Sequence, residues 1–530
     1  MDFVQNFPFM SILLSLFSGP LCSILDGKWA KRVNTAVITI IGGLSVSVLA
    51  YVVRTGQAFV YRMGHFPAPW GNEIRVGVLE AFMAAFFCVI MLLCMVSGVR
   101  EREEQIEESK QNLYYVMVNL LLCSLLALIY TNDLFTAYVF VEINTISACG
   151  LIMIRQTGRT IEAAIRYMIM SLLGSGLLLL GICHLYAVTG QLLMSNIKEA
   201  VQMLAAGQQY HITLMVALGL MSVGLAIKSA LYPFHAWLPD AYGYATLSSS
   251  AILSSLVSKG YIFLLIKIFY RVVGFELVME SKVANVLFVF GIIGMIMGSV
   301  NAIRTDDVKR MIAYSSVAQI GYIYMGLGLA TEAGTVASIY HVMSHAATKS
   351  LLFVAAAGLT GASRGEAHFI HTTGSTRQWK GITSERCRNA EQKAADECAH
   401  ESKDITGAAY RNKLAGVAFT VGSLSMVGMP MFSGFISKLF FAQAAVGHTH
   451  KMLPTFIALA ISTVLNAIYF MKTVIRIYTP VSEGIGRKVS VKEQPAKSAA
   501  LVCFILLNLI LGLNSEPIIR LIQGGLEMFG

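Results

Sequence analysis

Apolar windows of about 20 residues recur along the whole chain, separated by short polar connections. A helix of about 20 apolar residues is long enough to cross the hydrocarbon core of a bilayer. The pattern therefore predicts an all-α polytopic membrane protein with about 14 transmembrane helices. The predicted spans are residues 8–26, 33–53, 77–97, 112–130, 134–154, 165–187, 213–234, 248–272, 283–303, 310–330, 335–359, 414–443, 453–477 and 497–515.

Composition supports this class of protein. Of the 530 residues, 56% are hydrophobic and 13% are charged, which is not the composition of a soluble protein. The net charge of +10 does not indicate nucleic-acid binding, because the basic residues are dispersed among the connections. They are most frequent after spans 1, 3, 5, 9, 11 and 13, and the positive-inside rule places these connections in the cytoplasm. We therefore expect a multi-pass protein of a prokaryotic cell (inner) membrane, with both termini on the outer side.

Two connections are more polar than the others. Residues 98–110 form a charge run, which favours a solvated helical extension over a docking surface. Residues 361–413 form a longer polar insertion, whose cysteines and histidines match no metal-binding spacing. We interpret this insertion as a surface excursion rather than an ion-binding or regulatory segment. Because the chain also has no CxxC pair, the sequence predicts no metal site, no cofactor and no catalytic residue.

Two spans contain a proline. Pro233 follows Lys228 by five residues, and Pro430 lies in the span 414–443. Proline lacks an N–H and clashes with the carbonyl four residues before it, so each of these helices is expected to break. A broken helix beside a buried ionisable group is typical of ion paths through membranes.

Few ionisable residues lie inside the predicted spans. A charged side chain at membrane depth costs roughly 2.5–3.5 kcal/mol on insertion scales, so a chain that keeps several of them is expected to use them. The candidate proton pathway consists of Glu142, Lys228, Lys259, His341, His345, Lys349 and Lys438.

The histidines and one lysine of this set are regularly spaced. His341, His345 and Lys349 follow one another at intervals of four residues, which places them on one flank of a helix. Histidine can relay protons between lysines, because its reference pKa lies near 6.5. This flank is therefore a candidate route for protons or a chain of waters.

The order of the ionisable residues suggests a mechanism. A carboxylate–lysine pair that closes or separates can switch a neighbouring lysine between its charged and neutral forms. We hypothesise that Glu142 and Lys228 form this switching pair. Lys259 and the two histidines then form a central relay, and Lys438 is the far exit.

Simpler structural roles compete with this hypothesis. A single intramembrane lysine or glutamate can hold helices together, and a lone histidine in a span is usually an interhelical hydrogen-bonding residue. Lys259, Lys349 and Lys438 could also reach water from the ends of their spans. Glu80, four residues into its span, is interpreted as an interfacial residue. Taken together, the buried ionisable residues exceed what helix packing requires.

The segments around these residues resemble a known family, the antiporter-like proton-conducting membrane subunits of respiratory complex I, Mrp-type Na⁺/H⁺ antiporters and membrane-bound hydrogenases. The segments that carry the resemblance are NDLFTAYVFVEINTIS around Glu142, residues 163–190, IKSALYPFHAWLPDAY around Lys228, DDVKRMIAYSSVAQIGY at 306–322, HVMSHAATKSLLF at 341–353 and GMPMFSGFISK ending at Lys438. Lysine at 259 and 438 is most similar to the Mrp D-type subunit and its hydrogenase relatives.

The resemblance implies an arrangement of the spans. Spans 4–8 and 9–13 are expected to form two inverted five-helix repeats, with helices 7 and 12 broken. The chain then divides into residues 1–110 with three helices, 111–272 as the first repeat, 273–480 as the second repeat with the polar insertion 361–413, and 481–530 as the last helix and tail. The family's functional positions fall on Glu142, Lys228, Lys259, His345 and Lys438.

The resemblance also implies a function. The chain is expected to be a proton-translocating subunit of a multi-subunit complex, driven by an opposing cation gradient or by a redox partner. Its expected partners are other membrane subunits, the lipid bilayer, H⁺ and, as an open alternative, Na⁺, with no nucleic acid. The alternative is a non-conducting scaffold subunit of a respiratory or hydrogenase complex. A carrier for an organic solute is disfavoured, because no substrate pocket is evident.

Overall fold

The structure is a computed structural model, and it describes residues 3–66, 71–207, 210–363, 405–447, 450–480 and 489–529. Its first helices are α1 (Phe7–Ile24), α2 (Gly27–Thr55), α3 (Val78–Ser97), α4 (Val99–Gln105), α5 (Gln111–Tyr130), α6 (Leu134–Met153), α7 (Gly158–Thr189), α8 (Met194–Ala206), α9 (His211–Lys228), α10 (Leu238–Tyr244), α11 (Leu247–Ile252) and α12 (Ser258–Lys267). The later helices are α13 (Phe275–Glu280), α14 (Lys282–Arg304), α15 (Val308–Gly328), α16 (Glu332–Ser363), α19 (Ala408–Arg411), α20 (Lys413–Val427), α21 (Ser433–Val446), α22 (Met452–Tyr478), α23 (Pro495–Leu513) and α24 (Ser515–Glu527).

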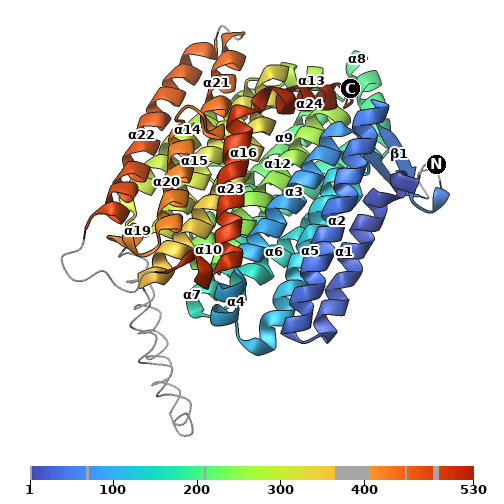
Figure 1. Ribbon diagram of the computed structural model, residues 1–530. Coiled ribbons are helices and arrows are strands. Elements are labelled where there is room, and N and C mark those ends of the chain that lie inside the picture. The colour runs from blue at the N-terminus through green and yellow to red at the C-terminus, as the bar shows by residue number, and fades with distance from the viewer. Residues whose placement is uncertain are drawn as a thin grey trace.

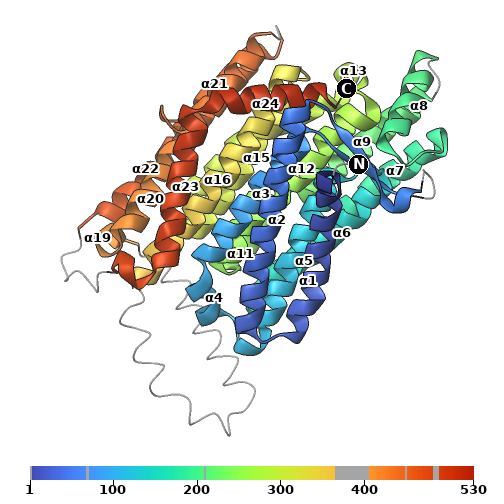
Figure 2. The same ribbon diagram turned by 45° about the vertical axis from the view of Figure 1, so that its right-hand side comes forward.

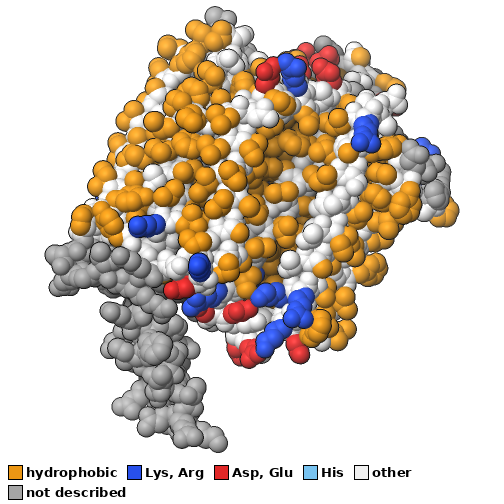
Figure 3. All heavy atoms as spheres, in the orientation of Figure 1, with side chains coloured by type: hydrophobic (Ala, Val, Ile, Leu, Met, Phe, Trp, Pro, Cys, Tyr) orange, Lys and Arg blue, Asp and Glu red, His pale blue; other side chains and the backbone are white. Residues whose placement is uncertain are grey.

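The long helices lie side by side in one bundle (Figures 1 and 2). Both chain ends lie at one end of the bundle, and α4 lies at the other (Figure 1). Hydrophobic side chains cover the flank of the bundle in Figure 3, whereas most charged side chains on this face gather near its two ends. An apolar girdle between charged ends is the surface expected of a protein that spans a bilayer.

Helices occupy all of the predicted spans, which confirms the all-α polytopic membrane class. In the described part of the chain, 12 helices are long and apolar enough to cross a membrane. Helix α15 is more polar, and the predicted span 414–443 contains two shorter apolar helices, α20 and α21. The count of about 14 transmembrane helices and the inverted repeats remain predictions.

Both expected helix breaks are present. Helix α9 ends at Lys228, five residues before Pro233, and α10 begins after the break. Helices α20 and α21 flank Pro430 in the same way. Each break contains a non-glycine residue in the left-handed region, Ala230 (φ 63°) and Met431 (φ 77°). Such residues persist only where surrounding contacts hold them, and they are frequent at functional sites.

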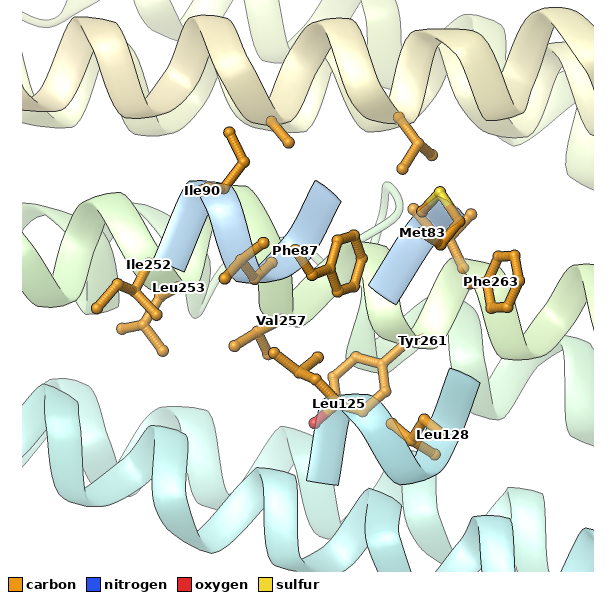
Figure 4. Packing of buried hydrophobic residues seen from close by; sticks show 14 of the residues in the cluster. Met83, Phe87, Ile90, Leu125, Leu128, Ile252, Leu253, Val257, Tyr261 and Phe263 are labelled. Atoms are coloured by element: carbon orange, nitrogen blue, oxygen red, sulfur yellow. The ribbon is translucent and has the colours of Figure 1, made fainter. Parts of the chain in front are cut away.

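The predicted span 248–272 is a helix with two π-helical turns. These turns are η4 (Leu253–Val257) and η5 (Ile268–Val273), on either side of α12. The helix from Leu247 to Val273 and the helix α16 are the most deeply placed, because every residue in the most apolar window of each is buried. In Figure 4, Val257 and Tyr261 pack against side chains of α3 and α5 such as Phe87 and Leu125.

Several short elements were not predicted from the sequence. The strands β1 (Phe59–Arg62) and β2 (Glu73–Val76) pair in an antiparallel hairpin, and four residues are too few for a clear alternating pattern. Helices α8 and α24 lie outside the predicted spans, and the remaining short turns are η1 (Phe3–Asn6), η2 (Met63–His65), η3 (Glu108–Lys110) and η6 (Val491–Glu493). Most of the predicted polar insertion, residues 364–404, lies outside the described residues.

The charged connection after α3 is less solvated than expected. Arg102 is 2% exposed and donates hydrogen bonds to the Met95 carbonyl (2.7 Å) and the Ser248 hydroxyl (3.1 Å). Glu101 forms an ion pair with Lys497 on α23, and both are largely buried. The prediction of a solvated extension is therefore wrong for these two residues. They tie α4 to α11 and α23, which the charge pattern alone could not reveal.

Helices α7 and α9 approach each other at two glycines. A Cβ added to Gly224 would lie 2.6 Å from the Gly174 carbonyl oxygen, whereas Gly219, on the same helix, has nothing within 4 Å. We expect Gly224→Ala to destabilise the protein by about 1–3 kcal/mol, which is the usual cost of overpacking. Gly219→Ala serves as the control and should not lower stability. Thermal unfolding in detergent measures both, and equal stability of the two variants would contradict the close contact.

Candidate functional site

The predicted pathway residues differ in burial. Five of the seven are buried: Lys228, Lys259, His341, His345 and Lys349. The other two, Glu142 and Lys438, are partly exposed. The alternative in which Lys259 and Lys349 reach water from the ends of their spans is therefore wrong, because neither has any exposed surface.

Lys228 lies near Glu142 but forms no ion pair with it. The Nζ atom donates to Thr145 Oγ1 (2.7 Å) and lies 5.4 Å from the centre of the Tyr261 ring. Glu142 precedes Thr145 by one turn of α6 and is close enough to interact with the charge of Lys228. The Glu142 Oε1 atom is shielded from solvent and has no hydrogen-bond partner. Glu142 and Lys228 therefore lie near each other without a direct contact, and their role as a switching pair remains a prediction.

Tyr261 connects this group to the helix that carries Lys259. Its hydroxyl donates to Asn144 Oδ1 (2.9 Å) and lies 3.4 Å from Thr145 Oγ1. Because Tyr261 follows Lys259 by two residues, α12 contacts the surroundings of Lys228 through this side chain. The two lysines therefore belong to neighbouring polar groups on packed helices.

Lys259 is the second residue of α12, just after the π-helical turn η4. Its Nζ atom donates to the Ser254 carbonyl and to the Ser258 hydroxyl (3.1 Å). A π-helical turn shifts the backbone hydrogen-bond pattern, so that a carbonyl can accept from a side chain instead. The turn thus supplies a partner for an ammonium group that has no exposed surface.

The regular spacing on α16 places its ionisable residues on one flank, as predicted. The rings of His341 and His345 are nearly parallel, with centres 6.0 Å apart. Lys349 donates to the Ile312 carbonyl (2.8 Å) and to the Ser315 hydroxyl, both on α15. His345 interacts electrostatically with both Lys259 and Lys349. These side chains therefore form one compact group.

Lys438 lies at the break between α20 and α21. Its Nζ atom donates to the Val427 carbonyl (2.6 Å) and to Thr463 Oγ1 on α22 (2.9 Å). Val427 is the last residue of α20, so the ammonium caps the negative end of that helix. The break thus supplies a partner for Lys438 in the way that η4 does for Lys259.

Two residues that sequence reasoning missed join His341 to Lys438. The Tyr322 ring stacks on His341 with centres 5.5 Å apart, and Lys438 Nζ lies 5.7 Å from the centre of the same ring. Ser437 lies 3.0 Å from His341 Nδ1. Ser437 could have been found from the sequence, because it is next to Lys438. Tyr322 carried no such signal, because tyrosines are common in these spans.

Several buried polar atoms of this region have no hydrogen-bond partner. They are both ring nitrogens of His345, His341 Nε2, Gln319 Nε2 and the Tyr322 hydroxyl. Buried polar atoms in proteins are almost always hydrogen-bonded, and unpaired ones mark strained, functional or water-binding positions. Their concentration beside the lysines is typical of a polar path through the bundle.

The lysines of this region have no counter-charge in direct contact. In the described ranges, no carboxylate oxygen lies within 4.0 Å of the Nζ atoms of Lys228, Lys259, Lys349 or Lys438. No group of three or more potential metal ligands occurs in the same part of the chain. The site is thus a row of lysines and imidazoles, in which carbonyl and hydroxyl oxygens hold the lysines.

A second buried charged group lies at the other end of α12. Glu80 is fully buried and pairs with Arg271 at 3.3 Å, so its interpretation as an interfacial residue is wrong. Lys267, also fully buried, donates to the carbonyls of Leu128 (3.2 Å) and Ile129 (2.9 Å) at the C-terminal end of α5. Sequence reasoning missed this group, because Glu80 and Arg271 are 191 residues apart.

A polytopic bundle with two broken helices and a buried row of lysines and histidines defines an antiporter-like membrane subunit. Residues 131–384 match the family described as NADH:quinone oxidoreductase/Mrp antiporter, TM. The chain is 30% identical to the N subunit of the NADH-quinone oxidoreductase of Desulforudis audaxviator, over 92% of this chain and 91% of that protein. The chain therefore belongs to this family.

Other similar proteins share its length and its fold. The chain is 23% identical to the D-type subunit of the Na(+)/H(+) antiporter of Alkalihalophilus pseudofirmus, over 98% of this chain and 96% of that protein. A chain of the archaeal membrane-bound sulfane sulfur reductase has the same fold (TM-score 0.82, 24% identity, 100% of this chain and 98% of that chain). So does a chain of the Mrp complex from Dietzia (TM-score 0.80, 21% identity, 99% of this chain and 97% of that chain).

The buried ion pair gives a prediction for stability. Arg271→Met leaves Glu80 buried without its cation, and we expect a loss of about 3–5 kcal/mol in the free energy of unfolding. The double variant Glu80→Gln/Arg271→Met should regain most of this loss, because the glutamine carries no charge and Lys267 keeps its carbonyl partners. Thermal unfolding of the purified protein in detergent measures both variants. An Arg271→Met protein as stable as the wild type would contradict the assigned pairing.

Proposed function

We propose that the chain is a proton-translocating, antiporter-like subunit of a multi-subunit membrane complex. One observation carries this proposal: the buried row of lysines and histidines has no carboxylate in contact with its lysines in the described ranges. Like charges in a desolvated interior repel strongly, so these groups do not all hold protons at once. A row with fewer protons than sites can pass protons from one site to the next.

The separated arrangement of Glu142 and Lys228 suggests how transfer begins. When the Glu142 carboxylate approaches Lys228, it stabilises the charged ammonium. When the carboxylate moves away, the buried ammonium loses this stabilisation and passes its proton towards Lys259. The histidines of α16 pass the proton along their shared flank. Lys438, the most exposed lysine of the row, releases it.

The drive for this movement comes from partner subunits or from a cation gradient. Similar proteins are named as subunits of a quinone oxidoreductase and of a Na⁺/H⁺ antiporter. We infer that this chain works beside other membrane subunits in a complex of either kind, and that Na⁺ is the exchanged cation in a complex of the second kind. Any redox reaction then takes place in the partners.

We further infer the orientation and the internal symmetry. Basic residues concentrate in connections that the positive-inside rule places in the cytoplasm. Both chain ends lie at the end of the bundle opposite α4 (Figure 1), which favours two termini on the outer side. The two broken helices, each with a lysine near the break, support two inverted five-helix repeats in segments 111–272 and 273–480.

One observation favours the alternative of a non-conducting scaffold. Lys349 and Lys438 each donate to a backbone carbonyl of another helix, and such bonds also hold helices together. A scaffold that loses one of these bonds should assemble poorly. A proton path should instead assemble normally and stop conducting.

The two functions can be separated with vesicles that carry the whole complex. We expect Lys228→Met and Lys438→Met to abolish proton movement, measured with a pH-sensitive dye after a Na⁺ pulse or after addition of a redox substrate. The amount of assembled complex should not change. The control is Lys472→Met, which alters an exposed lysine of α22 and should leave proton movement unchanged. Loss of assembly would favour the scaffold, and normal proton movement in both variants would refute the proposed path.

A further inference from the structure

The π-helical turn η4 supplies the carbonyl acceptor for Lys259, but the pathway described above gives no role to the side chains of this turn. A π-helical turn is costly, persists where contacts hold it, and is frequent at functional sites. Its apolar side chains Leu253 and Val257 belong to the apolar cluster with α3 and α5 (Figure 4). Its polar side chains Ser254 and Ser255 instead contact α15 and α16. The turn therefore joins the apolar core to the ionisable row.

Ser254 links the two most deeply buried lysines of the central group. Its carbonyl accepts a hydrogen bond from Lys259 Nζ, and its hydroxyl lies 3.2 Å from the Ser316 hydroxyl on α15. Ser316 donates to the Ile312 carbonyl (3.1 Å), which also accepts from Lys349 Nζ (2.8 Å). Lys259 and Lys349 are thus joined by a continuous series of contacts across three helical segments.

We propose that the Ser254–Ser316 contact positions Lys259 for proton exchange with Lys349 by holding the π-helical turn in place. This inference rests on the proposed proton pathway. Without the contact, the turn relaxes towards α-helical geometry, and the Ser254 carbonyl returns to a backbone amide. The Lys259 ammonium then loses the acceptor that fixes its position relative to Lys349.

The separation of these two lysines matters because no carboxylate of the described residues contacts either of them. Lys259 and Lys349 interact electrostatically with each other and with His345, whose ring nitrogens are both unpaired. Repulsion between like charges rises steeply as they approach in a desolvated interior. A small displacement of Lys259 therefore changes how readily one lysine loses its proton when the other is charged.

The same π-helical turn offers a matched control. The Ser255 hydroxyl donates to the Ala251 carbonyl (2.6 Å) and lies 2.6 Å from the Ser350 hydroxyl on α16. This second pair has the same chemistry and nearly the same burial as Ser254 and Ser316. Neither hydroxyl has a hydrogen bond to a pathway lysine in the structure. Removing the control pair therefore measures how much the loss of a buried serine contact alone affects proton movement.

The test compares Ser254→Ala, Ser316→Ala and their double variant with Ser255→Ala/Ser350→Ala, in vesicles that carry the whole complex. We expect each single variant to lower the maximal rate of proton movement about fivefold, the effect of one lost hydrogen bond in the transfer step. The double variant should be no slower than the singles, because both remove one contact. The half-saturating concentration of the driving cation or substrate should not change, and the control pair should stay near the wild-type rate.

The Lys259→Met variant distinguishes a failure of the proposed pathway from a failure of the positioning inference. Wild-type proton movement in Lys259→Met would overturn the proposed pathway itself. If Lys259→Met is inactive while the Ser254 and Ser316 variants match the control pair, only the positioning inference is overturned. Equal losses in both serine pairs would also overturn it, since they would indicate a packing effect. Ser316→Ala lies outside the π-helical turn and decides the question alone if the Ser254 variant does not assemble.

Discussion

The constraint on which this structure depends is the need to surround buried ammonium groups with oxygen atoms in the absence of adjacent carboxylates. An ammonium group removed from water is costly unless other dipoles replace its hydration. Here backbone carbonyls do so wherever a helix ends or its hydrogen bonding changes. Lys438 uses the end of α20, Lys267 the end of α5, and Lys259 the π-helical turn η4. Irregular helix geometry and buried charge therefore explain each other.

The same relation distinguishes the two charged groups of the bundle. At one end of α12, Lys267 and Arg271 are fixed by several carbonyls and by a direct ion pair with Glu80, which leaves little reason for a proton to move. At the other end, no carboxylate of the described residues contacts the lysines, and the neighbouring imidazoles have unpaired nitrogens. Residues of the same types, 8 to 12 positions apart on one helix, thus form a structural anchor and a candidate conducting site.

Much of the fold was predictable, because apolar length and proline act locally. The spans, the breaks at Pro233 and Pro430, and the shared flank of His341 and His345 all follow from residues within about 20 positions of one another. The missed features depend on contacts between distant segments. The partner of Glu80 lies on another helix, and the bond between Lys228 and Thr145 requires α6 and α9 to be packed first. No periodicity along the chain encodes such pairings.

The glycine contact between α7 and α9 has a consequence for the kind of motion available at Lys228. Because the backbones touch at Gly174 and Gly224, one turn before the lysine, α9 cannot slide or rotate there without a steric clash. Rotamer changes of the Glu142 and Lys228 side chains require no such movement of the helix backbones. In the proposed pathway, switching at Lys228 would therefore take place by reorientation of the Glu142 and Lys228 side chains, while the helices around them stay still.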